Sequence, residues 1–307
     1  MEHLSHFVAG WVAGMFGVIV GHPMDTIKTY QQTSNVELSM RQAIFIIIKR
    51  NGIQGMYKGI LFPLLCSGCL NSMYFGAYEI SMKSLQTIHG NEKIHPTNAY
   101  WMRDLFIAGC IGGFAQAFLS CPTELIKIRM QIGKGIDCNN NIICRSDSSN
   151  NSTNPLGSCK TASNIYRNYG IHGLFVGLLP TLLRDTFGGG VYILTYQYTR
   201  YYMYGKLNVN PGDIETIVAG GLAGMVSWIP VIPFDIIKSR IQADNLQNPV
   251  YKGMANCTVN LFKHSHCFGF FRGFTVITIR SVPVNIAIMW AYQFVLWFCK
   301  QLRALEI

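Results

Sequence analysis

The sequence of 307 residues has few charges. Asp, Glu, Lys and Arg together make up 13% of it, against roughly 25% in a typical soluble domain. The first apolar stretch is not preceded by the basic n-region of a secretory signal, and no Arg-rich transit peptide is recognisable. Any organelle-targeting signal is therefore expected to be internal. The ten cysteines are scattered and form no disulfide framework. These absences argue against a disulfide-rich scaffold and against two ordinary soluble domains.

The residue sets of an enzyme are also missing. No nucleophile–base–orienter set, metal cluster or cofactor-binding loop is recognisable, so we expect no catalytic residues, no metal and no cofactor. The spacing Cys66-x-x-Cys69 is compatible with a redox or metal pair, but two small polarizable side chains on one helix face explain it more simply. Clustered Lys and Arg residues can bind nucleic acid. In this sequence they lie in loops between apolar stretches, which is typical of the charge distribution of a membrane protein, so no nucleic-acid partner is expected.

Six stretches contain no charged residue at all. Five have 19 to 22 residues, and about 20 helical residues cross a bilayer. The fourth has 14 residues because Arg184 and Asp185 stand at its start. The mean hydropathy of +0.23 is low for helices wholly surrounded by lipid, so we expect helices with one polar face that lines a water-filled cavity. The stretches are 3–24, 59–78, 105–123, 186–199, 216–234 and 281–299.

The net charge of +10 is unevenly placed. The alternate loops 25–58, 124–176 and 235–272 hold 16 of the 25 Lys and Arg residues. Positive charge stays on the side from which a membrane chain inserts, and it suits anionic headgroups. Since the number of predicted spans is even, both termini are expected on the opposite side.

One charged sequence motif, which we call the repeated phrase, occurs three times, each time at the end of an apolar stretch. An acid lies two residues after a proline, a lysine five residues after it and a glutamine nine residues after it. Each proline is expected to kink its helix, because it cannot donate the i→i−4 hydrogen bond. Such self-similarity indicates three tandem repeats. The phrases are Pro23 to Gln32, Pro122 to Gln131 and Pro233 to Gln242.

A glycine- and aromatic-containing turn follows each phrase, at 52–59, 170–177 and, more weakly, 266–273. Each repeat therefore reads as a span, the charged phrase, a short polar helix, this turn and a second span. We place the repeats at 1–95, 96–208 and 209–307. Residues 133–158 are an Asn- and Ser-rich insertion in the second repeat, which we expect to be disordered.

The first span of each repeat contains closely spaced glycines. Small residues let transmembrane helices pack backbone to backbone, so we expect these positions to be helix contacts. They are Gly10, Gly14, Gly17 and Gly21, then Gly109, Gly112 and Gly113, then Gly220, Gly221 and Gly224.

The repeated phrase resembles the signature of the mitochondrial carrier family over essentially the whole chain. That resemblance implies an all-α membrane protein with six transmembrane helices in three pseudo-threefold repeats around a central cavity, each repeat adding a short matrix helix. It also implies the mitochondrial inner membrane, a multi-pass topology and both termini toward the intermembrane space. The departures lie outside the acid–lysine core. Tyr30 and Val176 replace bases, Asn51, Tyr169 and Ser265 replace acids, and His266 replaces a glycine.

Unpaired charges at the ends of apolar helices are costly, and pairing between repeats offers a remedy. The resemblance implies a matrix gate in which each acid pairs with the lysine of a neighbouring repeat, with the glutamines one helical turn beyond as hydrogen-bonding braces. The alternative is a static clamp that only holds helix ends together. The gate pairs are Asp25 with Lys127, Glu124 with Lys238 and Asp235 with Lys28, and the braces are Gln32, Gln131 and Gln242.

A second gate is implied at the other membrane side, on the second helix of each repeat. Only Glu79 and Arg200 keep the charges expected there, and we expect them to face each other. Tyr196 and Tyr292, with Tyr78, are expected to supply much of this cytosolic gate, unless they are ordinary interfacial aromatics.

The repeats differ at one depth of the second helix, where they carry Cys66, Arg184 and Arg280, followed in the second repeat by Asp185. A charge inside a membrane is by default functional. Two cations and one anion suit a carboxylate at one end of a substrate and an amino or quaternary ammonium group at the other. The rival interpretation is an internal Arg184–Asp185 pair, which the ~100° between adjacent helical residues disfavours. Asn71, Tyr74 and Tyr78 lie on the matching face of the first repeat, where aromatic rings can hold an alkylammonium.

The sequences around Arg184-Asp185 and Arg280 resemble the branch of carnitine/acylcarnitine and basic amino-acid carriers and its carnitine-carrier-like members. We therefore predict alternating-access transport of a small zwitterionic or cationic amino-acid-like metabolite, by a monomer. The alternative is a carrier fold without metabolite transport, such as a proton leak, a receptor or a scaffold. The resemblance further implies structural cardiolipin as a lipid partner, near 57–59, 251–253 and 271–273.

Overall fold

A computed structural model describes residues 2–34, 38–88, 100–132, 156–207, 213–246 and 249–305. In these residues the chain is helical and contains no strand. Six helices are long, with 28 to 32 residues. They are α1 (Glu2–Thr33), α3 (Leu61–Ile88), α4 (Trp101–Ile132), α6 (Leu178–Leu207), α7 (Asp213–Ala243) and α9 (Phe274–Leu305).

Each repeat also contains one shorter helix, which lies between its two long helices in the sequence. These shorter helices are α2 (Met40–Asn51), α5 (Leu156–Leu174) and α8 (Met254–Ser265), and short 3₁₀ turns follow two of them, η1 (Ile53–Tyr57) and η2 (Cys267–Phe271). Helix α2 begins with a capping box at Ser39. The Ser39 hydroxyl accepts a hydrogen bond from the Gln42 backbone N–H, and the Gln42 side-chain oxygen accepts one from the Ser39 backbone N–H.

The three repeats turn in the same way after the short helix. Gly52 and Gly170 both have φ 64°, and His266 has φ 48°. Combined with ψ near −150° to −170°, this region is essentially confined to glycine. His266 is therefore strained where the other repeats have a relaxed glycine.

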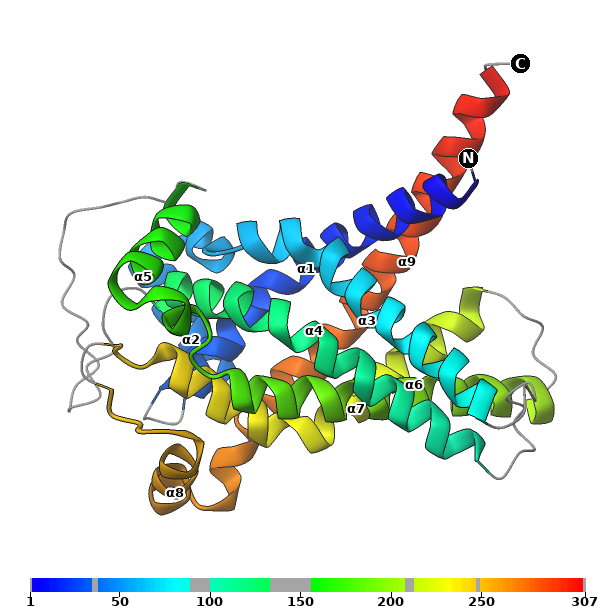
Figure 1. Cartoon of the computed structure of the whole chain (residues 1–307). Helices are drawn as coiled ribbons and strands as arrows, with labels where there is room; N and C mark the ends of the chain where they lie inside the picture. Colours follow the sequence, from blue (N-terminus) through cyan, green and yellow to red (C-terminus); the bar gives the residue numbers. More distant parts are fainter. Residues whose placement is uncertain are drawn as a thin grey trace.

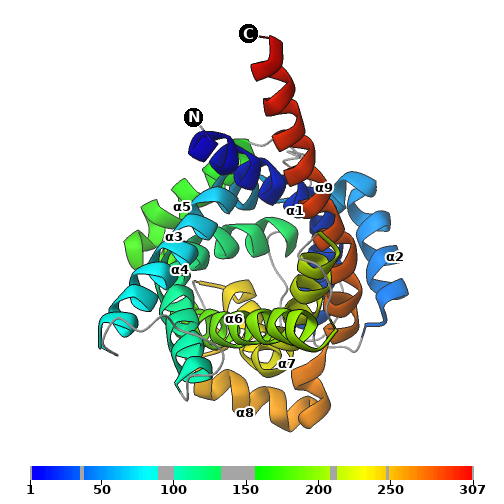
Figure 2. The ribbon, with the colours of Figure 1, turned by 90° about the vertical axis from the view of Figure 1, so that its right-hand side faces the viewer.

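The long helices form a closed ring in the order α1, α3, α4, α6, α7, α9 and back to α1. Figure 1 shows α2, α5 and α8 at one end of this ring, while α1 begins and α9 ends toward the other end. Figure 2 looks into the ring from the side that Figure 1 has on its right. The prolines of the repeated phrase lie inside α1, α4 and α7, which continue through them.

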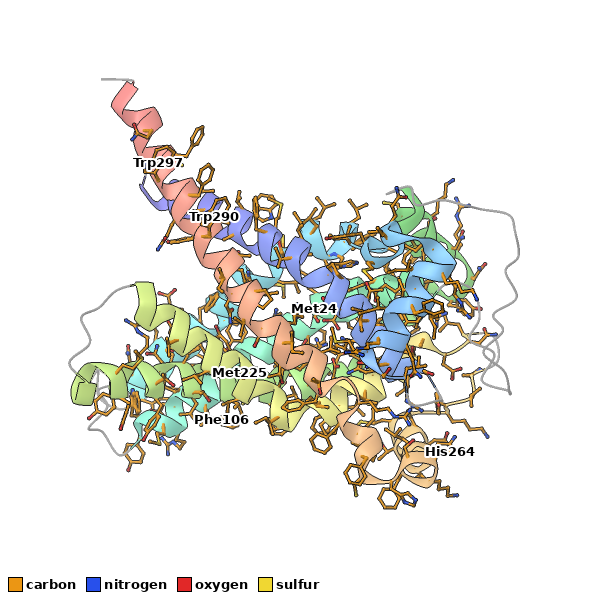
Figure 3. All side chains as sticks on the ribbon, turned by 180° about the vertical axis from the view of Figure 1, so that it is seen from behind. Met24, Phe106, Met225, His264, Trp290 and Trp297 are labelled. Carbon is orange, nitrogen blue, oxygen red and sulfur yellow. The ribbon has the colours of Figure 1, made fainter. Side chains whose placement is uncertain are left out.

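Apolar side chains point outward as well as inward. Phe114 and Trp297 are each about half exposed, and Trp290 and Trp297 lie toward the C-terminal end of α9 (Figure 3). By length and composition, four stretches among the described residues qualify as membrane spans, and they contain α3, α4, most of α7 and most of α9. An apolar outer surface on such helices is expected for a protein whose solvent is lipid.

The glycine-rich spans pack closely in the first two repeats only. A Cβ on Gly109 would lie 2.7 Å from the Gly189 carbonyl oxygen, and one on Gly17 would lie 2.6 Å from Ile288. Gly10, Gly220 and Gly221 have nothing within 4 Å of such a Cβ. The prediction of tight packing was therefore wrong for these three glycines, because their positions face open space.

The predicted repeat boundaries near 95 and 208 fall outside the described residues. So does most of the predicted insertion, 133–155. Its last residues, 156–158, are the start of α5, where Ser158 is buried. The prediction of disorder was therefore wrong for 156–158.

Candidate functional site: a charged cavity inside the helical ring

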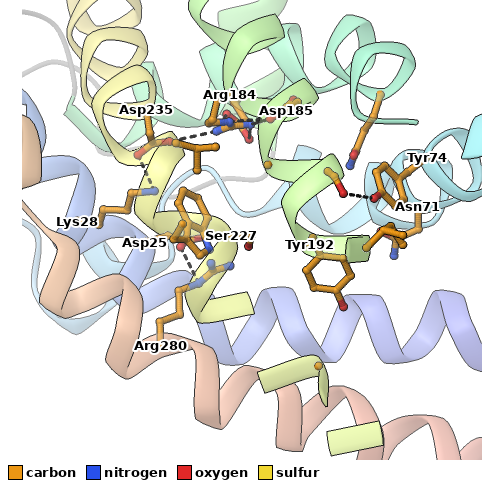
Figure 4. A pocket seen from close by; sticks show the side chains of 18 of the residues that line it. Asp25, Lys28, Asn71, Tyr74, Arg184, Asp185, Tyr192, Ser227, Asp235 and Arg280 are labelled. Carbon is orange, nitrogen blue, oxygen red and sulfur yellow. Dashed lines mark hydrogen bonds and ion pairs between the residues drawn. The ribbon is translucent and has the colours of Figure 1, made fainter. Parts of the chain in front are cut away.

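The long helices enclose a cavity of about 740 Å³. All six contribute to its wall, and the repeated phrases lie at its closed end. Figure 4 shows charged side chains gathered at one part of it and tyrosines at another. The predicted substrate residues all line this cavity: Asn71, Tyr74, Tyr78, Arg184, Asp185 and Arg280.

The three ion pairs implied by the resemblance are formed. Lys127 Nζ lies 2.6 Å from Asp25 Oδ2, and Lys28 Nζ lies 2.8 Å from Asp235 Oδ2. Lys238 pairs with Glu124. Each pair joins two different repeats, so together they connect α1, α4 and α7 into a ring of charges. We call this set of six residues the inner ring.

One of the three predicted braces is present. Gln32 Nε2 donates to Asp235 Oδ2 at 2.8 Å. Gln131 instead donates to the Thr26 hydroxyl at 2.9 Å, and Gln242 donates to the Val176 carbonyl at 3.2 Å. The brace prediction was therefore wrong for Gln131 and Gln242, because other acceptors, a hydroxyl and a carbonyl in the turn before α6, lie nearer to their amides.

A second set of contacts surrounds the inner ring, and the sequence did not suggest it. The residue two positions after each repeated lysine reaches a carbonyl at the end of the first long helix of the next repeat, and the third repeat reaches back to the first. Tyr30 donates to Gln131 O at 3.2 Å, Arg129 donates to Asp244 O, and Arg240 donates to Gln32 O at 3.0 Å. We call these three residues the outer ring. Cationic donors suit the last carbonyls of a helix, and Tyr30 supplies a neutral donor at the same place.

Arg184 lies at the centre of a carboxylate cluster. It donates to both oxygens of Glu124 at 2.8 and 2.9 Å, to Asp235 at 3.2 Å, and to its neighbour Asp185 at 2.7 Å. The argument against an Arg184–Asp185 pair was wrong. The side chains leave the helix in different directions, but the long arginine side chain brings its guanidinium back to the shorter aspartate.

Arg280 has a different environment. Its Nε lies 2.8 Å from Asp25 Oδ1, and its side chain is 24% exposed, against 11% for Arg184. Figure 4 shows Arg280 and Asp25 apart from Arg184 and Asp185. The two arginines therefore do not converge on one point.

The charges divide into two groups with different balance. Lys127 and Arg280 share the single carboxylate Asp25, which leaves one surplus positive charge. The second group is balanced among the described residues, with three cations facing three carboxylates. It contains Lys28, Lys238, Arg184, Asp235, Glu124 and Asp185. An added anion is therefore better accommodated beside Arg280 than beside Arg184.

The aromatic residues on α3 are partly occupied by packing. Tyr74 is only 6% exposed, and its hydroxyl donates to the Gly189 carbonyl at 2.9 Å. Tyr78 packs against the buried apolar cluster that contains Tyr74. A cavity aromatic that the sequence analysis missed is Trp228 on α7, whose ring carries the Lys28 ammonium 4.2 Å from its centroid. Its position five residues before Pro233, on the cavity face of a helix, was the available signal.

The predicted cytosolic gate is not assembled in this structure. Glu79 pairs with Lys83 one turn along its own helix at 2.9 Å, with both side chains exposed, rather than with Arg200. Arg200 lies 5.7 Å from the Tyr196 ring centroid. Tyr196 lines the cavity, whereas Tyr292 on α9 lies outside its lining. The Glu79–Arg200 pair was wrong for this conformation. The ion pairs between repeats that the described residues form lie at the end of the ring with α2, α5 and α8.

The turns before α3, α6 and α9 are built alike. Gly59, Gly177 and Gly273 have φ between 79° and 81°, where glycine is unstrained. Lys58 donates to Asn51 at 2.8 Å, and Arg272 donates to Ser265 at 3.0 Å. Asn51 and Ser265, which stand where the family has an acid, thus still accept hydrogen bonds from Lys58 and Arg272.

No group of three metal-ligating side chains occurs among the described residues. Cys66 and Cys69 are both free thiols, the first half-buried and the second exposed on the helix surface.

Comparison with known proteins gives one consistent result. The family model described as "Mitochondrial carrier protein" matches residues 1–89, 99–207 and 211–301. The human protein "Solute carrier family 25 member 45" is 34% identical over 95% of the chain and 98% of its own length. "Solute carrier family 25 member 48" of Danio rerio is 31% identical over 97% and 98%. The bovine "Mitochondrial basic amino acids transporter" is 33% identical over 92% and 87%.

Proposed function

Because the chain belongs to the mitochondrial carrier family, and is therefore a solute transporter of the inner mitochondrial membrane, we propose that it carries a small zwitterionic or cationic amino-acid-like metabolite by alternating access. Carnitine and its acyl esters, methylated amino acids and basic amino acids are the members of this class. The name of the bovine relative, a basic amino acids transporter, supports the amino-acid part of the proposal.

The observation that carries the proposal is the unequal charge of the cavity. The second and third repeats contribute Arg184 and Arg280 to the cavity, whereas the residue at the matching position of the first repeat, Cys66, is uncharged and lies outside the lining. A substrate with different ends needs such asymmetry. Its carboxylate goes to Arg280, where positive charge is in surplus. Asp185, which has one buried oxygen without a hydrogen-bond partner in this structure, adds the negative charge that attracts the cationic end into the cavity.

The same contacts suggest how binding opens the inner ring. Arg280 holds Asp25, a member of that ring. A substrate carboxylate on Arg280 competes with Asp25 and so weakens the contact between α9 and α1 that this pair makes. The pairs of the inner ring are largely buried, and the cost of desolvation offsets much of the Coulombic gain of such pairs, so the binding energy of a substrate is enough to favour opening.

In this proposal the inner ring is the matrix gate, and the end of the protein with α2, α5 and α8 faces the matrix. The cytosolic gate, with Tyr196, Tyr292, Glu79 and Arg200, closes when the inner ring opens. Cardiolipin binds near the turns that contain Lys58 and Arg272, and the working unit is a monomer.

Uptake by proteoliposomes tests the substrate class. The full-length protein is reconstituted and offered radiolabelled carnitine, trimethylated lysine, lysine, arginine and, as outsiders, citrate and ATP. We expect uptake of one or more zwitterionic or cationic compounds and none of the outsiders. Arg280→Ala should lower this uptake at least tenfold, because an interaction between charges inside a membrane is lost.

Trp290→Leu serves as the control, since Trp290 lies outside the cavity lining and is 59% exposed. Its uptake should match that of the unmodified protein. Uptake of citrate or ATP alone would contradict the substrate class, and equal uptake by Arg280→Ala would contradict the role of Arg280.

A further inference from the structure

Lys28 of the inner ring has two partners in the cavity. Its ammonium lies 2.8 Å from Asp235 and, at the same time, 4.2 Å from the centroid of the Trp228 ring. A cation at this distance from an indole is attracted by the negative face of the ring, and tryptophan is the best side chain for this interaction. The structure thus contains a cation-binding seat that one of its own lysines fills.

Trp228 is well placed to serve a ligand. It lines the cavity, and it also packs against the buried cluster of Ile232, Ile236, Leu261 and Ile277. The ring is therefore held in place by α7, α8 and α9 before any ligand arrives, so that little conformational entropy is lost on binding.

The other cavity aromatics offer less. The hydroxyl of Tyr74 ties α3 to α6, and its ring is buried. Tyr192 and Tyr196 stack on each other with centroids 6.3 Å apart, and Arg200 already lies near the Tyr196 ring. Among the residues that the structure describes along this wall, Trp228 has the ring that carries a cation from the inner ring.

We propose that Trp228 is the seat for the cationic end of the transported metabolite, and that Lys28 occupies it only while the inner ring is closed. This rests on the proposed function, since it requires a substrate with a cationic group. When that group takes the ring face, Lys28 loses one of its two partners and is held by Asp235 alone. The cationic end of the substrate then loosens the α1–α7 junction, while its carboxylate loosens the α1–α9 contact between Asp25 and Arg280.

The seat also favours one kind of cation. A primary ammonium has three N–H donors that need acceptors, and an indole face supplies none. A trimethylammonium group has no donors and is desolvated more cheaply, so it fits the ring better. The site therefore favours N-methylated substrates over their primary amines.

A ligand pair that differs only in charge tests this inference. Equilibrium binding to the purified full-length protein is measured for an amino acid that ends in trimethylammonium and for its isostere that ends in tert-butyl. The unmodified protein should bind the charged compound about 2- to 30-fold more tightly, the range that cation–π contacts provide. Trp228→Leu should bring the two affinities within twofold of each other, and Trp290→Leu should leave the preference intact.

Removal of the competing lysine gives a second, independent measurement. In Lys28→Gln, Asp235 keeps Arg184 and Gln32 as partners, so the protein should still fold. The empty seat should then bind the trimethylammonium compound several-fold more tightly than in the unmodified protein, and this gain should vanish in the double variant Lys28→Gln/Trp228→Leu.

A charge preference that survives Trp228→Leu, or a gain from Lys28→Gln that persists in the double variant, overturns the shared seat while the proposed function stands. If the unmodified protein binds neither compound, nor any other zwitterion of the panel, both proposals fall.

Discussion

At the scale of single residues, Arg184 and Arg280 show how burial and partners decide the role of a side chain. The two occupy matching positions in their repeats. Arg184 is surrounded by three carboxylates, whereas Arg280 shares one carboxylate with Lys127 and is more exposed. Arg184 therefore holds the cavity together, and Arg280 is the cation that an incoming anion can reach.

This difference predicts unequal effects of the same substitution. Arg184→Gln leaves Glu124, Asp185 and Asp235 close together with less compensation, and removal of one member of a buried charge network costs about 3–5 kcal/mol. Arg280→Gln should cost about 1 kcal/mol or less, because Asp25 keeps Lys127. Thermal unfolding of the two purified variants in the same detergent would measure this. Equal unfolding midpoints would contradict the division of roles.

At the scale of elements, the closest packing is between α4 and α6. A Cβ on Gly113 would lie 1.9 Å from the Asp185 carbonyl oxygen, and one on Gly109 would meet the backbone of Gly189 and Gly190. The two helices therefore approach backbone to backbone at the depth of the substrate residues, and the position of Asp185 depends on the absence of a side chain at Gly113.

Gly113→Ala should accordingly impair both stability and transport. The obstacle is backbone, which cannot rotate away as a flexible side chain can, so α6 must move and carry Asp185 with it. Overpacking of this kind typically costs about 1–3 kcal/mol. Gly10→Ala is the matched control, because a Cβ there has nothing within 4 Å. Uptake and unfolding are measured for both, and normal uptake by Gly113→Ala would show that the Asp185 position is not critical.

The helices and the inner ring were predictable because they repeat. Charge-free stretches of helical length, and three acids and three lysines at fixed offsets, are visible in one sequence. What failed depended on geometry that spacing does not contain. The guanidinium of Arg184 reaches back to Asp185, Gln242 finds a turn carbonyl instead of an ion pair, and Glu79 pairs along its own helix. Trp228 was missed because a tryptophan in an apolar stretch suggests packing first, and only its position relative to Pro233 marks it as a cavity residue.

At the scale of the whole molecule, the ring has two different ends. The end with α2, α5 and α8 is tied by both the inner and the outer ring, whereas Glu79 at the other end pairs only within its own helix. With the proposed orientation, this conformation is open toward the intermembrane space, and Cys159 on α5 and Cys267 on η2 face the matrix.

Cysteine labelling tests that orientation. Cys159 and Cys267 are exposed, so single-cysteine variants that keep either one should react with a membrane-impermeant maleimide only after mitoplasts are opened. Cys257 on α8 is the control at the same end. Its burial raises the pKa of the thiol to about 11, and maleimides react with the thiolate, so it should remain unlabelled in both conditions. Labelling of Cys159 in intact mitoplasts would reverse the orientation.

The closure between α1 and α7 has a consequence for how the protein is made. Lys28 and Gln32 meet Asp235, and the Gln32 carbonyl meets Arg240, across more than 200 residues of chain. During assembly in the membrane, α1 therefore lacks these partners until the third repeat has folded beside it. Until the third repeat arrives, its charged end must be tolerated by water, lipid headgroups or a chaperone. A polypeptide that stops after the second repeat keeps that end unmatched, which gives quality-control proteases a chemical mark by which an unfinished copy differs from a complete one.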